Sequence, residues 1–448
     1  MKFYDTSVTH LYEDGRKISL SSLALPIFIE HSSAGLFSII NTLLVSGYSR
    51  DTVAAIGVVG QLSGFIINIL MISVWGMRVI LGIELGRSRR KNACTVMGTA
   101  FWMSLIFSLF IGLFCIYFTD ELLSMMNLEG TTKQIAADYS FIIFGFYFIT
   151  ICKSFFAVAL TCNGHSKHTA LSVIMAQLIN IISGWAVLYG GLETPLNKAA
   201  ALALCTVFAQ FVSLVYVLTI MKKKKCPLGF KFSLFQMKRI LKIGLPASAN
   251  GIGYTFGQTV TTAMITSLGA TAITAKIYIS NIATYISYFS GSIGQATAIL
   301  MGRFRGKLQQ EKEDRLFWQS IRLAMFLNLF VSVCVFIFRR PILGIFTDSP
   351  EIISLAAKVM FIDIFVQAVR GSTNIGDQSL TANGDVRIVS AVSLSACCAV
   401  TILFAWLFGI KLGLGLVGCW LAFLLEEIYK SSFYVLRWKK GKWKSQEI

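Results

Sequence analysis

One short stretch of this sequence occurs twice, 220 residues apart. Residues 160–169 read LTCNGHSKHT and residues 380–389 read LTANGDVRIV, and each is a small polar interruption in apolar sequence. Asn-Gly suits the end of a helix, where the chain needs a residue with positive φ. We therefore predict the same helix-ending loop in two copies.

The two halves match elsewhere at the same offset. Total identity is close to what an apolar composition gives by chance, so the argument rests on clustered matches that need no gap across five predicted helices. They are Leu25-Pro26 with Leu245-Pro246, Gly82 and Gly86 with Gly302 and Gly306, Ala136-Ala137 with Ala356-Ala357, and Phe141-Ile142 with Phe361-Ile362. We interpret this register as an internal duplication.

The composition is that of a membrane protein. Of the 448 residues, 55% are hydrophobic and only 14% are charged, against roughly 25% charged in a soluble domain, and the mean hydropathy is +0.69. A transmembrane helix needs roughly 20 mostly apolar residues. Apolar runs predict an all-α integral membrane protein with twelve transmembrane helices, at residues 20–45, 54–84, 92–118, 134–160, 167–190, 196–221, 238–266, 271–302, 315–339, 352–380, 386–410 and 414–437.

The net charge of +18 comes from bases in short connections between apolar runs, which favours topology signals over nucleic-acid binding. Bases collect on one predicted side: Arg16, Lys17, Arg87, Arg89, Arg90, Lys91, Lys167, the run 222–225, Lys231, Lys238, Arg239, Arg303, Arg305, Lys307, Lys312, Arg315, Arg387, Lys439, Lys440, Lys442 and Lys444. The other side has Arg50, Lys133, Lys198, Arg339, Arg340 and Lys411. We expect a multi-pass protein of the cell (inner) membrane with both termini cytoplasmic.

Six helices per half make the halves parallel repeats, since both start on the same side of the membrane. The predicted domains are a cytoplasmic segment (1–17), an N-lobe (18–221), a cytoplasmic linker (222–237), a C-lobe (238–437) and a basic tail (438–448). The first residues lack the basic start and apolar core of a cleavable signal peptide.

The ensemble of these features resembles the multidrug and toxic compound extrusion (MATE) family. The features are two six-helix bundles, a Leu-Pro in the first helix of each, a Gly-x-x-x-Gly before each basic second loop, and the Asn-Gly loops. Residues 243–276, IGLPASANGIGYTFGQTVTTAMITSLGATAITAK, are similar to the branch of bacterial DNA-damage-inducible exporters. The resemblance implies a V-shaped pair of lobes with a central cavity, and export by alternating access driven by inward Na⁺ or H⁺.

The sequence departs from the family at the usual cation-coupling carboxylates. The first-helix acid falls on Asn41, and the fifth-helix Asn is present as Asn180 but is followed four residues later by Gly184. The seventh-helix glutamate falls on Tyr254, and the tenth-helix aspartate falls near Arg370. Coupling by the family's usual residues is therefore not expected.

The tenth predicted helix has a polar stripe. Asp363, Gln367, Arg370, Asn374 and Asp377 follow one another by four, three, four and three residues, which places them on one face. Two interpretations are open: a structural clamp, with a carboxylate on each side of the guanidinium, or a substrate or proton path, because intramembrane charges are usually functional.

The first helix provides a candidate titrating site. Glu30 and His31 follow Pro26 by one turn, and a proline can free a backbone carbonyl that holds a cation or proton. Glu30 is the predicted replacement carboxylate, with His31 assisting because its pKa lies near physiological pH. The alternative is a solvated Glu30 at the edge of the cavity.

Other polar groups lie in apolar runs. Gln61, Asn68 and Arg78 share one face of the second helix, which is typical of a cavity lining or of helix packing. Lys153 and Lys276 are either snorkelling side chains or, for Lys153, part of a basic cavity. If Lys153, Arg78 and Arg370 all face the cavity, we expect an anionic substrate.

Three apparent motifs carry no function here. Residues 413–418 spell G-x-G-x-x-G but open a membrane helix without a preceding strand. Cys162, His165 and His168 have spacing for zinc but lack a fourth ligand and a counterpart in the second copy, so we expect no metal. The lysine run 222–225 is a solvated connector.

The favoured function is a secondary active exporter of multidrug or other organic compounds by cation antiport. Its expected partners are a small-molecule substrate and the lipid bilayer, with no nucleic acid, no cofactor beyond a coupling H⁺ or Na⁺, and a monomeric state. The alternative is a flippase for lipid-linked oligosaccharides, or a flippase or exporter of another anionic substrate, of the same superfamily. A membrane enzyme is not expected because no nucleophile or metal constellation is visible, and a non-transporting scaffold remains open because the usual carboxylates are absent.

Overall fold

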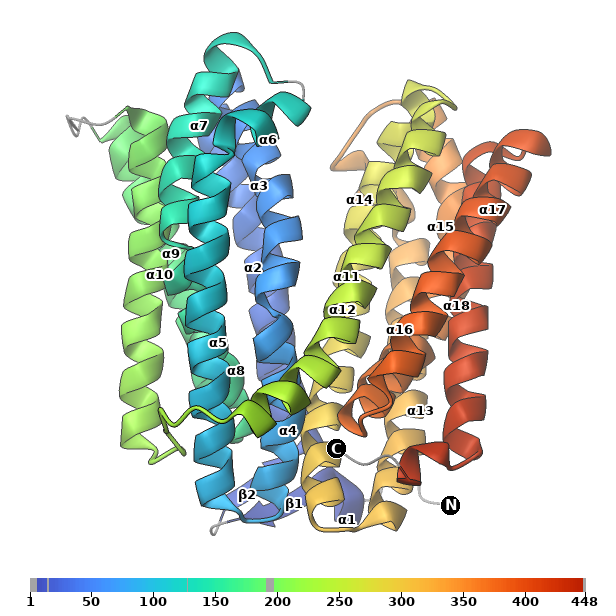
Figure 1. The fold of residues 1–448 in the computed structure, drawn as a ribbon. Helices are drawn as coiled ribbons and strands as arrows, with labels where there is room; N and C mark the ends of the chain where they lie inside the picture. Colours follow the sequence, from blue (N-terminus) through green and yellow to red (C-terminus); the bar gives the residue numbers. More distant parts are fainter. Residues whose placement is uncertain (1–5, 14–15, 127, 191–196, 446–448) are drawn as a thin grey trace. The chain divides into compact units, whose positions relative to one another are not determined.

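The computed structural model describes the chain except for residues 1–5, 14–15, 127, 191–196 and 446–448, and it is almost entirely helical (Figure 1). A short amino-terminal segment holds α1 (Thr6–Thr9) and an antiparallel hairpin of β1 (His10–Glu13) and β2 (Arg16–Ser19), in which Leu11 pairs with Ile18. The first half continues with α2 (Leu20–Ser46), α3 (Arg50–Leu70), α4 (Ile72–Gly86), α5 (Arg90–Tyr117), α6 (Thr119–Met125), α7 (Gly130–Gly145), α8 (Tyr147–Cys162), α9 (Ser166–Tyr189) and α10 (Lys198–Lys223). The second half has α11 (Leu234–Thr266), α12 (Ala270–Gly306), α13 (Gln310–Ile337), α14 (Arg339–Gly344), α15 (Pro350–Ala382), α16 (Val386–Ser395), η1 (Ala396–Thr401), α17 (Ile402–Phe404), η2 (Ala405–Lys411), α18 (Gly415–Lys439) and η3 (Lys442–Ser445).

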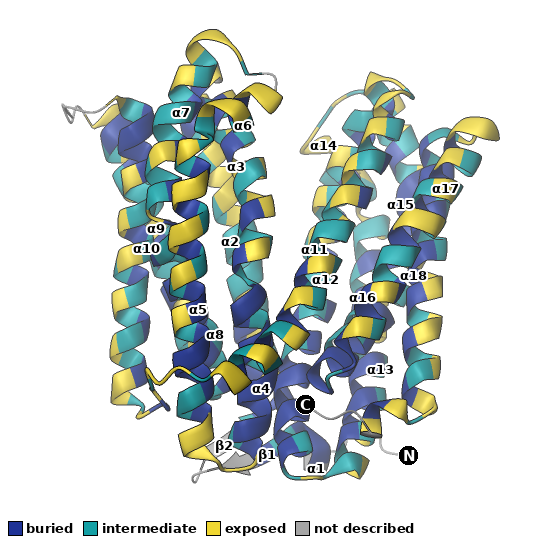
Figure 2. Ribbon diagram, viewed as in Figure 1, coloured by how far each residue is buried: buried dark blue, intermediate teal, exposed yellow. Residues whose placement is uncertain are grey.

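The all-α membrane architecture is confirmed. Each of the twelve predicted ranges falls on a helix or on consecutive helical segments. Among the described residues, eight helices are long and apolar enough to cross a membrane, or nine if α7 and α8, which meet at a 48° bend, form one span. Large apolar side chains stay exposed along these helices (Figure 2), as on α5, where Phe110 is 69% and Leu113 is 67% exposed. Such surfaces suit contact with lipid chains.

Two predicted helices of the first half are broken. The second span divides into α3 and α4 at Met71, and the fourth divides into α7 and α8 at Phe146, whereas their counterparts α12 and α15 are continuous. Glycine, which has low helix propensity, ends α7 at Gly145; nothing in the local sequence explains the break at Met71. The fifth span of the second half contains two π-helical stretches, η1 and η2.

The chain divides into two compact units. One unit is residues 25–244, and the other combines residues 1–24 with 245–448. The two boundaries lie 220 residues apart, each directly before a Leu-Pro pair. The boundaries differ from the predicted domains. Residues 18–24 belong to the unit of residues 245–448, and residues 238–244 belong to the unit of residues 25–244. The predicted amino-terminal segment and linker are parts of these two units.

Each unit packs its helices in the same order. In the unit of residues 245–448, α15 contacts α12, α13 and α18. In the unit of residues 25–244, α7 and α8 take the place of α15 and contact α3, α4, α5 and α10. At the 220-residue offset α3 and α4 together correspond to α12, α5 to α13 and α10 to α18, so packing as well as sequence repeats.

The Asn-Gly loops have the predicted conformation. Gly164 has a φ of 81° and Gly384 a φ of 83°. In each loop the residue after the glycine donates its backbone N–H to the carbonyl five residues earlier, His165 to Leu160 at 3.1 Å and Asp385 to Leu380 at 3.0 Å. This is the Schellman ending of a helix, present twice.

Candidate functional site

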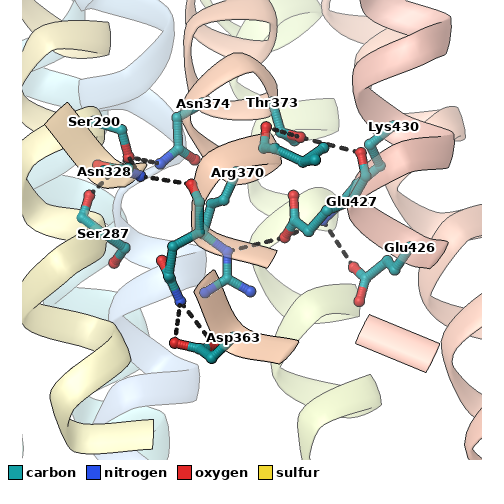
Figure 3. A network of polar contacts seen from close by, with 12 residues as sticks. Ser287, Ser290, Asn328, Asp363, Arg370, Thr373, Asn374, Glu426, Glu427 and Lys430 are labelled. Atoms are coloured by element: carbon teal, nitrogen blue, oxygen red, sulfur yellow. Dashed lines mark hydrogen bonds and ion pairs between the residues drawn. The ribbon is translucent and has the colours of Figure 1, made fainter. Parts of the chain in front are cut away.

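The second unit contains a group of charged side chains between α15 and α18 (Figure 3). Arg370 Nε of α15 donates to Glu427 Oε1 of α18 at 3.0 Å. Lys430 Nζ donates to the same Glu427 oxygen at 3.3 Å and to Glu426 Oε1 at 2.8 Å. We call these four residues the charged cluster. On α18, Glu426 and Glu427 precede Lys430 by four and three residues, and this helical spacing brings both carboxylates to the Lys430 ammonium group.

Two of the stripe's carboxylates are engaged by other groups. Asp363 is buried and accepts hydrogen bonds from Gln367 Nε2 at 3.3 Å and from Trp420 Nε1 at 3.1 Å. Asp377 accepts a hydrogen bond from Thr381 Oγ1 at 3.2 Å. One of the two interpretations of the stripe was a clamp of Asp363 and Asp377 around Arg370. Asp363 is an electrostatic neighbour of Arg370, but the carboxylate that hydrogen-bonds the guanidinium is that of Glu427. Seven residues along a helix span roughly 10 Å, too far for both carboxylates to bind one guanidinium, so Glu427 of another helix binds it instead.

The amides of the stripe hold three helices together. Asn374 Nδ2 of α15 donates to Ser290 Oγ of α12 at 2.8 Å. Asn328 of α13 donates to the same hydroxyl at 3.0 Å and to the carbonyl of Gln367 at 2.9 Å. Figure 3 shows Asn374, Ser290 and Asn328 pointing toward one another. All these groups are buried or half-buried, so Gln367 and Asn374 contribute to packing inside this unit.

Tyr254 of α11 lies near the charged cluster. It is an electrostatic neighbour of Arg370 and is 50% exposed. The two positions where the family's carboxylates were expected, the seventh and tenth helices, are thus occupied by a phenol and a guanidinium in the same unit.

In the unit of residues 25–244, Glu30 of α2 and Lys153 of α8 are electrostatic neighbours. Both side chains are half-buried, as is His31 beside Glu30. Pro26 lies inside α2, four residues before Glu30. The sequence named Glu30 and Lys153 separately, and the structure brings them together.

The remaining candidates of this unit are dispersed. Asn180 Oδ1 of α9 accepts a hydrogen bond from Thr206 Oγ1 of α10 at 3.2 Å, so it links two helices. Gln61 is exposed on α3, where Asn68 donates to the carbonyl of Gly64 in its own helix.

Two further candidates of this unit are half-buried. Arg78 lies on α4, beyond the break at Met71. The predicted single face of the second helix is therefore divided between two helices. Asn41 lies on α2.

The Cys162, His165 and His168 motif forms no metal site in the described part of the chain, where no three such side chains gather. Cys162 is buried, and His168 Nδ1 lies 3.1 Å from the Tyr216 hydroxyl.

Sequence reasoning missed the charges of α18. Glu426, Glu427 and Lys430 lie within a predicted span, and their three- and four-residue spacing was a visible signal of an intrahelical ion pair. Their role as partners of Arg370, 57 positions away in the chain, has no such local signal.

Comparison with known families agrees with the repeat. The family model described as MatE matches residues 26–186 and again residues 246–407. This chain belongs to the MATE family. The two matches begin 220 residues apart, at the prolines that follow the unit boundaries.

Relatives of this MATE protein extend over nearly its whole length. It is 30% identical over 433 residues to the uncharacterized transporter YisQ of Bacillus subtilis, covering 96% of this chain and 95% of the relative. It is 22% identical to the probable multidrug resistance protein NorM of Thermotoga maritima, covering 96% and 93% of the two chains.

Solved structures show the same fold. A MOP superfamily transporter from Pyrococcus furiosus matches with a TM-score of 0.87 at 18% identity, covering 95% of this chain and 96% of that one. That protein is described as having a binding pocket of reverse polarity, which suggests a different function for it. A mutant form of the Vibrio cholerae MATE transporter VcmN matches with a TM-score of 0.86 at 15% identity, covering 94% of this chain and 96% of that one.

Proposed function

We propose that this protein is a secondary active exporter that moves a small organic compound out of the cell against an inward flow of H⁺ or Na⁺. Membership of the MATE family and two equivalent helical units support alternating access, in which repeated units change the side from which a site is reached. The family match does not favour the flippase alternative.

The pairing of Glu30 with Lys153 carries the proposal of cation coupling. A carboxylate and an ammonium group in apolar helices stabilise each other, because an isolated charge there is costly. When Glu30 binds H⁺ or Na⁺, its attraction to Lys153 weakens. Pro26 removes a backbone donor from the same helix and gives α2 a place to bend. Cation binding then shifts the balance between two arrangements of α2.

The test is transport in proteoliposomes that contain the full chain, loaded with rhodamine 6G or carboxyfluorescein and given an imposed pH or Na⁺ gradient. We expect gradient-driven movement by the wild type. Glu30→Gln should remove the response to the gradient, while Glu121→Gln, the same change at an exposed residue of α6, should keep it. Equal coupling in both variants would exclude Glu30 as the coupling residue, and no gradient-driven movement of either probe would contradict the exporter.

We further infer that the protein works in the cell membrane as a monomer, with both termini in the cytoplasm. The distribution of Lys and Arg between the two sets of connections supports this orientation.

A further inference from the structure

We infer that Arg370 binds an anionic group of the transported compound, so that the substrates include organic anions that carry a carboxylate or a similar oxyanion. This inference rests on the proposed export function and names the substrate class for it. It depends on which nitrogen atoms of the guanidinium already have hydrogen-bond partners within the unit of residues 245–448.

The free end of the guanidinium is the first observation. Arg370 donates one hydrogen bond, from Nε to Glu427 at 3.0 Å. In the part of the chain that the structure describes, its two terminal nitrogens, Nη1 and Nη2, have no hydrogen-bond partner, and Figure 3 shows both without a dashed line. The side chain is 21% exposed, whereas that of Glu427 is 3% exposed. The end that carries four N–H donors is thus the accessible one.

The orientation of the Arg370 side chain is held by contacts at its Nε edge and at the neighbouring backbone. Glu427 holds Nε, and Lys430 binds the same carboxylate oxygen at 3.3 Å. On the helix, the adjacent Gly371 lies against α13, where an added Cβ would approach the backbone nitrogen of Met325 to 2.8 Å. A guanidinium held at one edge presents its other two nitrogens as a planar fork, which matches the two oxygens of a carboxylate.

The charges of this region indicate that an anion would be bound by directed hydrogen bonds and not by an excess of positive charge. Arg370 and Lys430 are opposed by Glu426, Glu427 and Asp363, so no net positive charge remains if all five are ionised. Each carboxylate already accepts hydrogen bonds from this unit. An added anion therefore gains two directed hydrogen bonds from Arg370 but no net long-range attraction, since the five groups together carry one negative charge. Binding of moderate strength follows, which suits a transporter that must also release its substrate.

Tyr254 supplies a second contact. The residue is 50% exposed and is an electrostatic neighbour of Arg370. A phenol can donate a hydrogen bond to an oxyanion, and its ring offers apolar surface to the rest of an organic molecule. The favoured ligand is therefore an aryl or alkyl carboxylate, and an inorganic anion would lack the apolar contact.

The test uses probes that differ in one group, a charged carboxylate or the neutral amide of nearly the same size. Benzoate, 1-naphthylacetate and 1-pyrenebutyrate, each with its primary amide, are measured for export from proteoliposomes and for their effect on the unfolding temperature of the full chain in detergent. We expect the wild type to prefer at least one acid over its amide by roughly tenfold, since a charge-assisted pair of hydrogen bonds is lost with the amide.

Variants assign the preference to one residue. Arg370→Gln should abolish it, Arg370→Lys should reduce it because an ammonium has no planar fork, and Tyr254→Phe should weaken it less. Arg322→Gln is the matched control, since Arg322 is a half-buried arginine of α13 whose Nε bonds the carbonyl of Trp318 in its own helix. The unfolding temperature of each variant without ligand shows whether it folds. If Arg370→Gln does not fold, Arg370→Lys and Tyr254→Phe decide the question.

The outcomes separate this inference from the proposed function. The inference is supported if the wild type and Arg322→Gln prefer acids and the Arg370 variants lose this preference. The inference is overturned if the wild type transports and binds acids and amides equally, or if Arg370→Lys and Tyr254→Phe keep the full preference. In that case, gradient-driven export of rhodamine 6G in the same vesicles would still support the proposed exporter. Acid-selective binding in detergent without any gradient-driven movement would instead contradict the exporter and keep the anion site.

Discussion

Arg370 and Glu427, on two helices of the same unit, are joined by a 3.0 Å hydrogen bond between ionised groups, and the carboxylate is 3% exposed. The same carboxylate oxygen accepts a second hydrogen bond from Lys430. Breaking a buried ion pair by removing one partner is strongly destabilising, because the remaining charge stays buried without its counter-charge. This pair is therefore important for stability as well as for the orientation of Arg370.

Glu427→Gln should lower the free energy of unfolding by about 3 kcal/mol, since it leaves two cations facing one remaining acid of α18. Heat unfolding of the protein in detergent measures this. Asp348→Asn, at an exposed carboxylate of the same unit, should change stability by less than about 0.5 kcal/mol. Equal melting of the two variants would show that the charged cluster adds nothing to stability.

Glycine at position 371 is required by the close approach of α15 to α13. Gly371→Ala would place a Cβ 2.8 Å from the backbone nitrogen of Met325, so we expect a loss of about 1–3 kcal/mol from overpacking. Gly291→Ala, inside α12, meets no atom within 4 Å and should be neutral or stabilising by up to about 1 kcal/mol through helix propensity. Thermal unfolding of the two variants side by side tests this, and an identical shift would contradict it.

The hydrogen bond between Asn180 and Thr206 joins α9 to α10 at 3.2 Å. Thr206→Val keeps the shape but removes the donor, so we expect a loss of about 0.6 kcal/mol, the average for interhelical hydrogen bonds in a membrane protein. Thr219→Val removes a hydroxyl that bonds only the backbone of its own helix, at Val215. A loss in Thr219→Val as large as in Thr206→Val would argue against an interhelical role.

Ser88 is a non-glycine residue with a φ of 57°, at the end of α4. A side chain in left-handed backbone costs about 1 kcal/mol, so Ser88→Gly should stabilise the protein by up to that amount. Ser88→Ala keeps the Cβ and should give no gain. Unfolding midpoints of both variants decide the matter, and a gain in Ser88→Ala alone would mean that backbone strain is not the cause.

Sequence could predict features that recur or that follow from local chemistry. The Asn-Gly pairs predicted positive φ at Gly164 and Gly384, because glycine alone adopts it without cost. Helical spacing predicted a shared face for the polar residues of α15, but their partners lie on different helices, α18 for Arg370 and α12 for Asn374. The 220-residue register predicted two units with equal starts, which the contacts place at Leu25 and Leu245.

Sequence could not predict which helices meet. Asp363 and Asp377 were the nearest acids to Arg370 along the chain, but the partner is Glu427 of α18, because packing brings α18 against α15. The pairing of Glu30 with Lys153 depends on packing in the same way. The break at Met71 has no proline or glycine beside it, so helical periodicity continues through it unchanged.

The amino-terminal segment has a consequence for how the protein is made. Helix α1 (Thr6–Thr9) packs on α13 (Gln310–Ile337), so this segment finds its neighbour only after about 300 further residues have been synthesised. Residues 25–244 can assemble during translation. The start of the chain must wait, and a truncation before residue 310 would leave it without a docking surface.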